Sequence, residues 1–416
     1  MPAFVGIDFG TSNTTVGVSQ GGAVNLLPLE QDHQTIPSAI FFDFASRRPF
    51  CGRAAVDHYL GGHEGRYMQS LKSILGSSLI DEKTRIQSKS MSFADIIGHF
   101  FAFLKSRMES QLGREVSQVV VGRPVHFVDG DAAADAQAQR SLEEIARGQG
   151  FRDVAFQYEP IAAALDYEQR VQREELVLIV DIGGGTSDFS IVRVSPQRSG
   201  LAQRKDDILA NGGVHIGGTD FDRALSLARV MPHLGFGTKT ADGKRNLPTH
   251  YFYDLATWHS INSLNRKGVI TELRQVRYQA ARRDLVDRLI RVVEDRHGHT
   301  LALAVEQAKI KLTGQSAATV EVPYPDWEKI IATRGDFDVA VGEAVQRVVA
   351  TVQALLNDAS LKAGDINTIF VTGGSSMVPV LRQGILSLFP HAKIETGNLL
   401  GSVGIGLALD AKRKFG

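Results

Sequence analysis

Cysteine is almost absent from this sequence: Cys51 is the single cysteine among 416 residues. An internal disulfide is therefore excluded, and a structural zinc site built on thiolates is disfavoured. The chain opens directly into an apolar alternating run, with no basic segment and apolar core of the kind that a secretory signal has. No uninterrupted apolar run approaches roughly 20 residues, the length of a membrane span. We therefore expect a cytoplasmic protein with no membrane partner.

An excess of charge of either sign is also lacking. Lysine and arginine number 46, as do aspartate and glutamate, so the composition gives no reason to expect nucleic acid as a partner. A chain of this length is too long for one simple core and suggests two large lobes. Strand patterns alternate with helix patterns in both halves, which predicts an α/β fold.

The stretch LIVDIGGGTSDFSI, at 178–191, places an aspartate and three glycines between two runs of strand-forming residues. Glycines at Gly183, Gly184 and Gly185 allow positive φ and let several backbone N–H groups point outward together, which suits a phosphate. A glycine-rich hairpin without a ligand is the alternative. Because a strand follows the turn and no G-x-x-x-x-G-K-[ST] occurs, the pattern is that of a phosphate hairpin rather than a P-loop.

The same plan occurs at the N-terminus, where FVGIDFGTSNTTVGV at 4–18 again joins two alternating runs through an aspartate and a small-residue turn. A third turn, in TIFVTGGSSMVP, follows a buried strand and precedes a helix for which Ser375 or Ser376 is the candidate N-cap. Its backbone could lie flat against a purine ring. The candidate phosphate and purine contacts in these turns are Gly10, Thr11, Ser12, Asn13, Thr186, Gly373, Gly374 and Ser375.

Asp8 and Asp181 end the strands that lead into the first two turns. Carboxylates are suitable for Mg²⁺, which prefers hard oxygen ligands and usually keeps several waters. We expect both residues to hold a magnesium ion through water. Asp188, seven residues after Asp181, could orient a water or merely satisfy the amides of the turn.

The arginine-rich segment Thr271 to Asp295 is predicted to be one long helix. Its acidic residues alternate with its arginines, and an apolar stripe runs along it, which favours a solvated amphipathic helix over a nucleic-acid patch.

Several motifs resemble the nucleotide-binding domain of the heat-shock 70 (DnaK) chaperones, within the actin-like ATPase superfamily. They are spread over nearly the whole chain: GIDFGTSN, VVVGRPVHF, YEPIAAALDYE, VDIGGGTSDFS, HIGGTDFD, EQAKIKLT and FVTGGSSMVP. GFRDVAFQYEPIAAALDYE and MPHLGFG resemble most closely the stand-alone, chaperone-like YegD-type proteins. The resemblance implies an actin-like fold, two ribonuclease-H-like lobes that each carry an inserted subdomain, with ATP or ADP and Mg²⁺ in the cleft between them.

The resemblance also implies roles for individual residues. Asp8 and Asp181 would organise the metal; Glu159 would align the attacking water and sense the γ-phosphate together with Pro160; and Lys72, in LKSILG, would neutralise charge during phosphoryl transfer. Without the resemblance, Lys72 reads as a surface lysine, and Glu306 and Lys309 as an ion pair one helical turn apart. The implied adenosine-side contacts are Gly217, Gly218, Glu306, Lys309, Thr313, Met377 and Asn398.

The chain departs from the chaperone pattern at three places. Met377 stands where these chaperones usually stack an arginine on adenine, and Asn398 stands where they have an aspartate. Adenine binding is therefore expected to be looser or altered. The stretch 223–300 is longer than its chaperone counterpart, and LPTHYFYDLATWHSINSL within it has no counterpart.

The expected lobes are residues 1–173 with 396–416, carrying an insertion at about 37–112, and residues 174–395, carrying an insertion at about 218–335. We expect no peptide-binding domain, because the sequence ends in the helix pattern GSVGIGLALDAKRKFG. The expected protein is a monomeric, Mg²⁺-dependent ATPase that passes its nucleotide state to an unidentified protein partner. The alternatives are a nucleotide-binding pseudo-ATPase, an actin-like filament protein and, least favoured, a small-molecule kinase.

Overall fold

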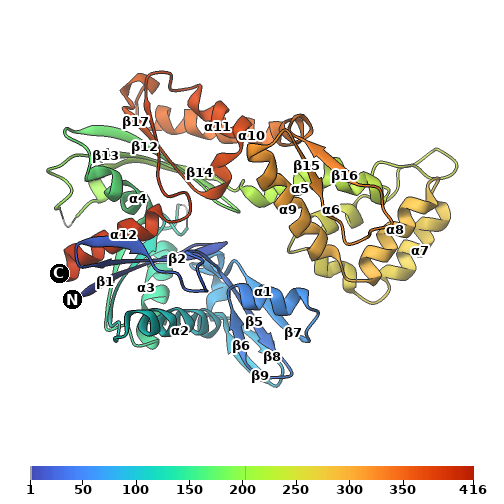
Figure 1. Ribbon diagram of the computed structural model, residues 1–416, viewed down its shortest axis with the longest axis horizontal. Coiled ribbons are helices and arrows are strands. Elements are labelled where there is room, and N and C mark those ends of the chain that lie inside the picture. The colour runs from blue at the N-terminus through green and yellow to red at the C-terminus, as the bar shows by residue number, and fades with distance from the viewer. Residues whose placement is uncertain (1, 129, 202) are drawn as a thin grey trace. The chain divides into compact units, whose positions relative to one another are not determined.

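The computed structural model describes residues 2–128, 130–201 and 203–416 and consists of two compact units. The first unit comprises Met1–Gly213, Val352–Ser376 and Leu388–Gly416, and the second comprises Val214–Thr351 and Met377–Ser387. Helices and mixed β-sheets occur in the chain as the α/β prediction requires (Figure 1). The proposed lobe boundaries remain predictions.

Two sheets of the first unit repeat one plan. In each, an antiparallel hairpin is extended on one side by a third strand and on the other by two parallel strands. The first sheet has the order β11-β10-β1-β2-β3, with β4 beside β2, and the second has the order β14-β13-β12-β17-β18. The two hairpins that the duplicated sequence pattern predicted thus lie in two similarly built sheets, and the division of the chain into two similar lobes remains a prediction.

The strands of these sheets are rich in valine, isoleucine and threonine, which suit a pleated surface. Those of the first sheet are β1 (Ala3–Phe9), β2 (Asn13–Gln20), β3 (Ala23–Leu26), β4 (Ile36–Pro37), β10 (Gln118–Arg123) and β11 (Asp153–Tyr158). Those of the second are β12 (Glu175–Ile182), β13 (Ser187–Val194), β14 (Ile208–Val214), β17 (Thr368–Thr372) and β18 (Lys393–Thr396).

Two helices, α4 (Glu159–Glu168) and α12 (Ser402–Phe415), share one core with both sheets. Ile161 and Leu407, from the two helices, are buried with Val120 of the first sheet and Val177 of the second. Figure 1 shows α12 beside β1, so that the two ends of the chain lie close together. Gly406 allows this packing, because a Cβ there would lie 1.7 Å from the carbonyl oxygen of Ala162.

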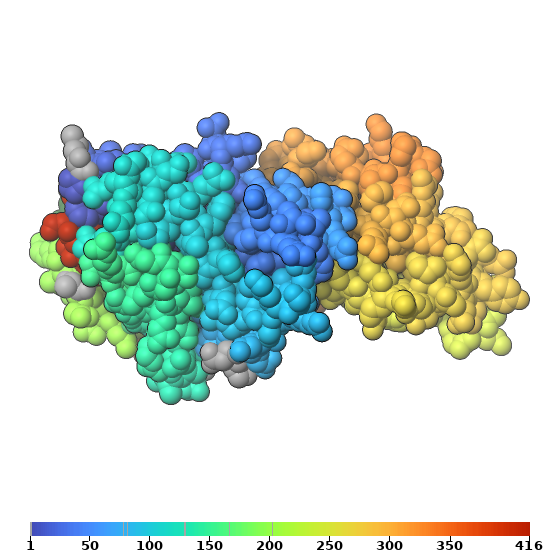
Figure 2. Space-filling view, turned by 90° about the horizontal axis from the view of Figure 1, so that it is seen from below, coloured from blue at the N-terminus to red at the C-terminus, as the bar shows by residue number. Residues whose placement is uncertain are grey.

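The rest of the first unit surrounds the first sheet. It contains helices α2 (Phe93–Leu112) and α3 (Ala132–Gly148) and a smaller region made of β5 (Ala39–Asp43), β6 (Pro49–Cys51), α1 (Arg53–Leu60), β7 (Gly65–Gln69), β8 (Lys83–Ile86) and β9 (Lys89–Ser92). A capping box formed by Ser92 and Asp95 begins α2. Figure 2 shows this blue region next to the teal surface of α2 and α3.

The second unit is mainly helical. It contains α5 (Gly218–Leu225), α6 (His250–Ala256), α7 (Val269–Gln279), α8 (Arg283–Glu294), α9 (Gly298–Gly314), α11 (Pro379–Leu386) and the hairpin of β15 (Ala317–Val320) and β16 (Ile330–Thr333). The prediction of one helix over Thr271 to Asp295 was wrong. The chain turns between α7 and α8 because Ala280 adopts an extended conformation and forms a β-bridge with Thr240.

Helix α10 (Arg334–Asp358) is long and apolar enough, by length and composition alone, to pass a test for a membrane span. A core helix of a soluble protein passes the same test. One stripe of the helix is buried, including Phe337, Val341, Val345 and Val348.

Candidate functional site

The first predicted turn, residues 10–12, joins β1 to β2, and the hairpin register places Asp8 opposite Thr15. Gly10 is required by space, since a Cβ there would lie 2.2 Å from the carbonyl oxygen of Asn13. Asp8 therefore lies near the end of the paired strands, two residues before Gly10, where a larger residue would clash with Asn13.

Ser38 was not predicted from the sequence. It stabilises this turn through three polar contacts. Its hydroxyl donates to the carbonyl oxygen of Gly10 at 2.7 Å, its backbone N–H donates to the carbonyl oxygen of Ser12 at 2.9 Å, and Thr14 Oγ1 lies 2.8 Å from its Oγ. The serine precedes a buried strand and carries no motif of its own, so only the fold reveals its role.

The second turn, residues 183–186, joins β12 to β13 and places Asp181 opposite Asp188. The backbone N–H of Gly183 closes the turn on the carbonyl oxygen of Thr186 at 3.0 Å. Thr186 Oγ1 donates to Asp188 Oδ2 at 2.7 Å, so the Asp188 carboxylate is oriented by its own turn.

The three turns converge. A Cβ on Gly184 would lie 2.3 Å from Ser12 Oγ, so the second turn contacts the first. Gly373, at φ +80°, contacts the second turn, because a Cβ there would lie 2.4 Å from the carbonyl oxygen of Ile182 and 2.6 Å from Asp181 Oδ1. Segments separated by most of the chain thus bring their backbones and small side chains to one place in the first unit.

After the third turn the backbone differs from the prediction. Residues Gly374–Met377 form a short 3₁₀ turn, and α11 begins at Pro379 with Val378 in the N-cap position, so neither Ser375 nor Ser376 caps the helix. Ser376 Oγ instead donates to the carbonyl oxygen of Gly373 at 2.5 Å. A proline at the first helical position has no N–H, so one of the donors that the first turn of a helix leaves unpaired is absent here, and its φ already suits the helix.

Asn398 lies in the loop before α12. Its Oδ1 accepts from the backbone N–H of Leu400 at 3.3 Å, and its carbonyl oxygen accepts from Ser402 Oγ at 2.8 Å. The next residue, Leu399, accepts from the N–H of Gly373 at 2.8 Å. Asn398 therefore shapes the loop that supports the third turn.

Lys72 and Glu159 meet although 87 residues separate them. Lys72 Nζ donates to Glu159 Oε1 at 2.5 Å, and both side chains are largely buried. Glu159 is the first residue of α4, where its carboxylate also favours the positive end of the helix. Gly122 leaves room for it, since a Cβ there would lie 3.3 Å from Glu159 Cγ. Lys72 is therefore not the surface lysine that its local sequence alone suggests.

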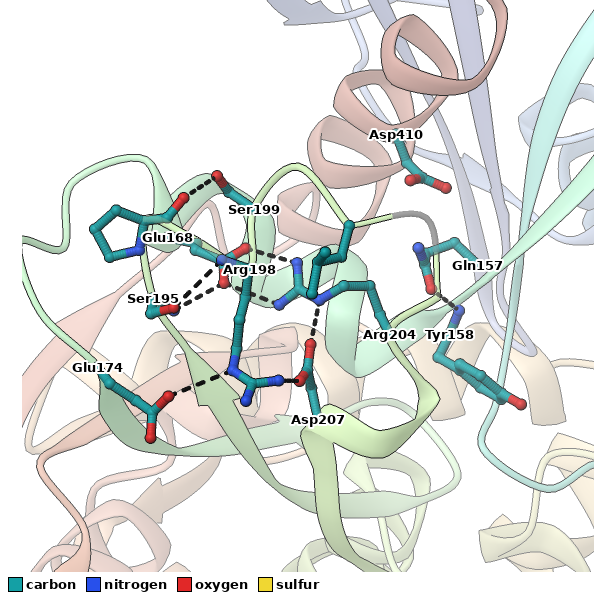
Figure 3. A network of polar contacts seen from close by, with 12 residues as sticks. Gln157, Tyr158, Glu168, Glu174, Ser195, Arg198, Ser199, Arg204, Asp207 and Asp410 are labelled. Atoms are coloured by element: carbon teal, nitrogen blue, oxygen red, sulfur yellow. Dashed lines mark hydrogen bonds and ion pairs between the residues drawn. The ribbon is translucent and has the colours of Figure 1, made fainter.

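The far end of α4 is fixed by a buried charged network (Figure 3). Arg204 donates to both carboxylate oxygens of Glu168, at 2.8 and 2.9 Å, and also pairs with Asp207. Arg198 pairs with Asp207 from the other side. Because one missing partner would leave a buried charge unpaired, this network holds the end of α4 in one arrangement.

The pKa values of both candidate metal carboxylates are raised in the folded protein. Burial and the nearby Glu159 raise the pKa of Asp8 to about 7, against a smaller opposing effect of Lys72. Burial, Asp188, Asp8 and Glu159 raise the pKa of Asp181 to about 8, again opposed by Lys72. Burial alone would lower the pKa of Lys72, but Glu159 and Asp8 together raise it.

This donor set fits a divalent cation. Two carboxylates whose ionisation is held back by burial and by neighbouring carboxylates ionise more easily when a cation lies between them. Both residues keep some surface in contact with solvent, so ions and water can reach them. Within the described residues, no three His, Cys, Asp or Glu side chains cluster closely enough to hold a metal by themselves. A magnesium ion here would therefore keep waters and phosphate oxygens among its ligands.

In the second unit, Lys309 is buried in α9 and does not pair with Glu306. Its Nζ donates to Asp222 Oδ2 at 2.9 Å and to the carbonyl oxygen of Gly218 at 3.2 Å. Burial raises the pKa of Asp222 to about 6, although Lys309 opposes the shift. Asp222, in the HIGGTDFD motif, was not assigned a role from the sequence.

The other residues of the second unit that were predicted to contact nucleotide make contacts within their own segments. Thr313 Oγ1 donates to the carbonyl oxygen of Ile310 in its own helix at 2.7 Å. The N–H of Gly217 donates to Asp220 Oδ2 at 3.0 Å at the start of α5. Met377 is 38 % exposed, and its sulfur lies 3.9 Å from Arg382 Nη1.

The family profile described as Hsp70 protein matches residues 4–230 and 287–414, which together are most of the chain. The chain belongs to the Hsp70 family. Its two repeated sheets are consistent with the actin-like ATPase fold of the Hsp70 nucleotide-binding domain, and membership implies that the chain binds adenine nucleotide.

Residues 231–286 lie outside the two matched stretches of the Hsp70 profile. They include LPTHYFYDLATWHSINSL, the stretch without a chaperone counterpart. This stretch packs on the start of α9: Gly298 leaves room for Ile261, and His299 Nε2 lies 3.1 Å from the carbonyl oxygen of Trp258. Burial lowers the pKa of His299 to about 4. The unmatched segment therefore supports the same helix that carries Glu306 and Lys309.

Proposed function

We propose that this Hsp70 chain is a Mg²⁺-dependent ATPase of the chaperone-like, YegD-type branch, and that it switches between nucleotide states. The single observation that carries the proposal is that the two phosphate-type turns, the Gly373–Gly374 turn and the Lys72–Glu159 pair all lie in one unit. A filament protein of the same superfamily would need the turns, but the proposal gives a reason for the buried pair as well.

In this proposal the phosphates lie against residues 10–13 and 183–186, which meet where the Ser12 side chain contacts Gly184, and the backbone of residues 373–374 lies against the purine. Glu159 orients the water that attacks the γ-phosphate, and the Lys72 ammonium neutralises the charge that grows on the transferred group. Asp8 and Asp181 would hold Mg²⁺ through water. When bound, the ion neutralises phosphate charge. Little covalent chemistry is left for the protein.

The proposed switch follows from the contact between Ser12 and Gly184. These residues lie in hairpins of the two repeated sheets, so a phosphate held by both hairpins binds the closed arrangement of the sheets more tightly than an open one. A ligand shifts a conformational equilibrium by that difference in affinity. The partner that reads the shift is a protein that has yet to be identified, and we propose a cytoplasmic location.

We propose adenosine contacts at Glu306, Lys309 and Thr313 of α9, the residues that the Hsp70 resemblance implies. Lys309 is already held by Asp222, so its ammonium has a defined position before any ligand arrives. Met377 offers a thioether in place of a stacking guanidinium. This exposed residue favours a second candidate function, a nucleotide-binding switch that hydrolyses ATP slowly or not at all.

Thermal unfolding with ATP, ADP, GTP or no nucleotide, each with and without Mg²⁺, tests binding, because a ligand of the native state raises the melting temperature by mass action. Single-turnover hydrolysis of bound ATP separates the two candidates. We expect adenine nucleotides with Mg²⁺ to stabilise most and bound ATP to be cleaved. Stabilisation without cleavage would favour the slow or inactive switch, and no stabilisation by any nucleotide would contradict both.

A further inference from the structure

Arg123 is a buried arginine at the end of β10 to which none of the motifs gave a role. Its guanidinium carbon lies 5.2 Å from the ring centre of Phe127 and 5.2 Å from that of Tyr158. Only 9 % of the side chain is exposed. An arginine placed near two rings in this way interacts with both aromatic faces, which a lysine does less well.

The guanidinium also fastens the loop that follows β10. Nη2 donates to both carboxylate oxygens of Asp135 in α3, at 3.0 and 2.7 Å, and to the carbonyl oxygen of Val125 at 3.3 Å. Asp135 Oδ1 accepts in turn from the backbone N–H of Phe127 at 2.6 Å. Arg123 and Asp135 together hold residues 124–127 against α3.

The contact of Arg123 with Tyr158 links it to Glu159. Tyr158 occupies the N-cap position of α4 and directly precedes Glu159. In the parallel pairing of β10 with β11, Arg123 stands opposite Tyr158, and its neighbour Gly122 lies against the Glu159 side chain. A shift of the Arg123 side chain would therefore move the residue from which α4 begins.

A second set of contacts links Arg123 to Lys72. The short turn η1 (Leu71–Ile74) carries Lys72 and is followed by Gly76 at φ +82°. A Cβ on Gly76 would lie 2.5 Å from Val128 Cγ2 and 3.3 Å from Ala138 Cβ in α3. The segment that carries Lys72 thus packs on the loop and the helix that Arg123 and Asp135 join.

We propose that Arg123 is a positioning residue that sets the separation and direction of the Lys72–Glu159 pair. The inference rests on the proposed ATPase function. Arg123 contacts neither partner of the pair; it fixes the backbone on both sides of it. Because misplacement by about 1 Å can cost about 100-fold in rate, loosening this support slows hydrolysis more than it weakens nucleotide binding.

The test compares Arg123→Lys with a matched control variant. Asp135→Asn, a milder change, is measured as well in case Arg123→Lys folds poorly. Lys105 is suitable for the control, because it is also a largely buried cation that lies 5.6 Å from an aromatic ring, that of Phe151, and pairs with Glu109. Its variant is Lys105→Gln. Single-turnover hydrolysis and the Kd of Mg·ADP are measured for every variant.

We expect Arg123→Lys to lower the hydrolysis rate by about 10- to 100-fold while the Kd changes less than about 3-fold, with no rate change in Lys105→Gln. In a Lys72→Ala background, Arg123→Lys should cost almost nothing more, since residues that act as a unit are not additive. A wild-type rate in both test variants, or an equal loss in both backgrounds, would overturn the proposal.

Amide hydrogen exchange separates failure of this inference from failure of the proposed function. If the wild-type protein does not hydrolyse ATP, the ATPase proposal is wrong, and exchange still tests the positioning role. In Arg123→Lys, residues 71–76 and 158–162 should lose protection together, whereas Lys105→Gln should leave both segments protected. Unchanged protection of either segment in Arg123→Lys would overturn the positioning role.

Discussion

Replacement of Asp181 by asparagine should stabilise the protein without ligand and abolish most of its response to Mg·ATP. In the folded chain the pKa of Asp181 is about 8, against an ordinary 3.8, chiefly because of burial and the nearby Asp188. At about 1.36 kcal/mol per pH unit, this difference corresponds to a ceiling of roughly 6 kcal/mol. The residue keeps some exposed surface, and screening by solvent reduces the ceiling. We expect a gain of about 2 kcal/mol at pH 8.5.

The sign of the pH dependence follows from proton binding. Between about pH 4 and pH 8 the folded state holds a proton on Asp181 that the unfolded chain has already released, so the wild-type free energy of unfolding falls as pH rises through this window. The asparagine side chain of the variant carries no such proton. The stability of Asp181→Asn relative to wild type should therefore increase from about pH 4 to about pH 8 and then level off.

Urea unfolding of both proteins at pH 5, 7 and 8.5, without nucleotide or Mg²⁺, measures the effect. Repetition at pH 7 with Mg·ATP should reverse the order, because the wild type gains binding free energy that the variant lacks. An Asp181→Asn variant less stable than wild type by the same amount at every pH would refute the reasoning. Equal stabilisation of both proteins by Mg·ATP would refute the metal assignment.

Three further predictions concern the other parts of the site. Lys72→Ala should slow single-turnover hydrolysis far more than it raises the Kd of ATP, because the ammonium acts on charge that develops during transfer; a wild-type rate would reject the role. Met377→Arg should tighten adenine nucleotide binding by about 0.5 to 2 kcal/mol through stacking, and a calorimetric loss would mean that the adenine site is built differently. Ser38→Ala should weaken Mg·ATP binding, whereas Ser199→Ala, which also removes a hydroxyl that donates to a carbonyl oxygen but on the surface, should leave the affinity unchanged.

Local sequence was sufficient to predict the two hairpins that carry the candidate phosphate turns. Each turn is closed by its own strands, so the hairpin pattern and its repetition placed the glycines in the turns and the aspartates at the strand ends, whereas the binding roles of these residues remain predictions. The duplicated pattern also predicted two hairpins of one plan, and the two sheets that contain them repeat one strand order.

Residues that act through tertiary contacts could not be predicted in this way. Ser38, Asp222 and Arg123 take their partners from distant segments, and none lies at a spacing that indicates one. Roles for Lys72 and Glu159 were expected only from the family resemblance, and their contact with each other was not predicted. The helix predicted over 271–295 breaks because Ala280 pairs with Thr240, a long-range bridge that periodicity does not reveal.

The most direct measurement of the central claim is a calorimetric titration of Mg·ATP into the wild-type protein and into Gly184→Ala. A Cβ at Gly184 would lie 2.3 Å from Ser12 Oγ, so the substitution separates the two hairpins that are proposed to hold the phosphates. The account predicts saturable, Mg²⁺-dependent binding to the wild type and at least a roughly 10-fold weaker Kd for Gly184→Ala, about 1.4 kcal/mol. Equal affinity of the two proteins, or no binding of Mg·ATP to the wild type, would contradict it.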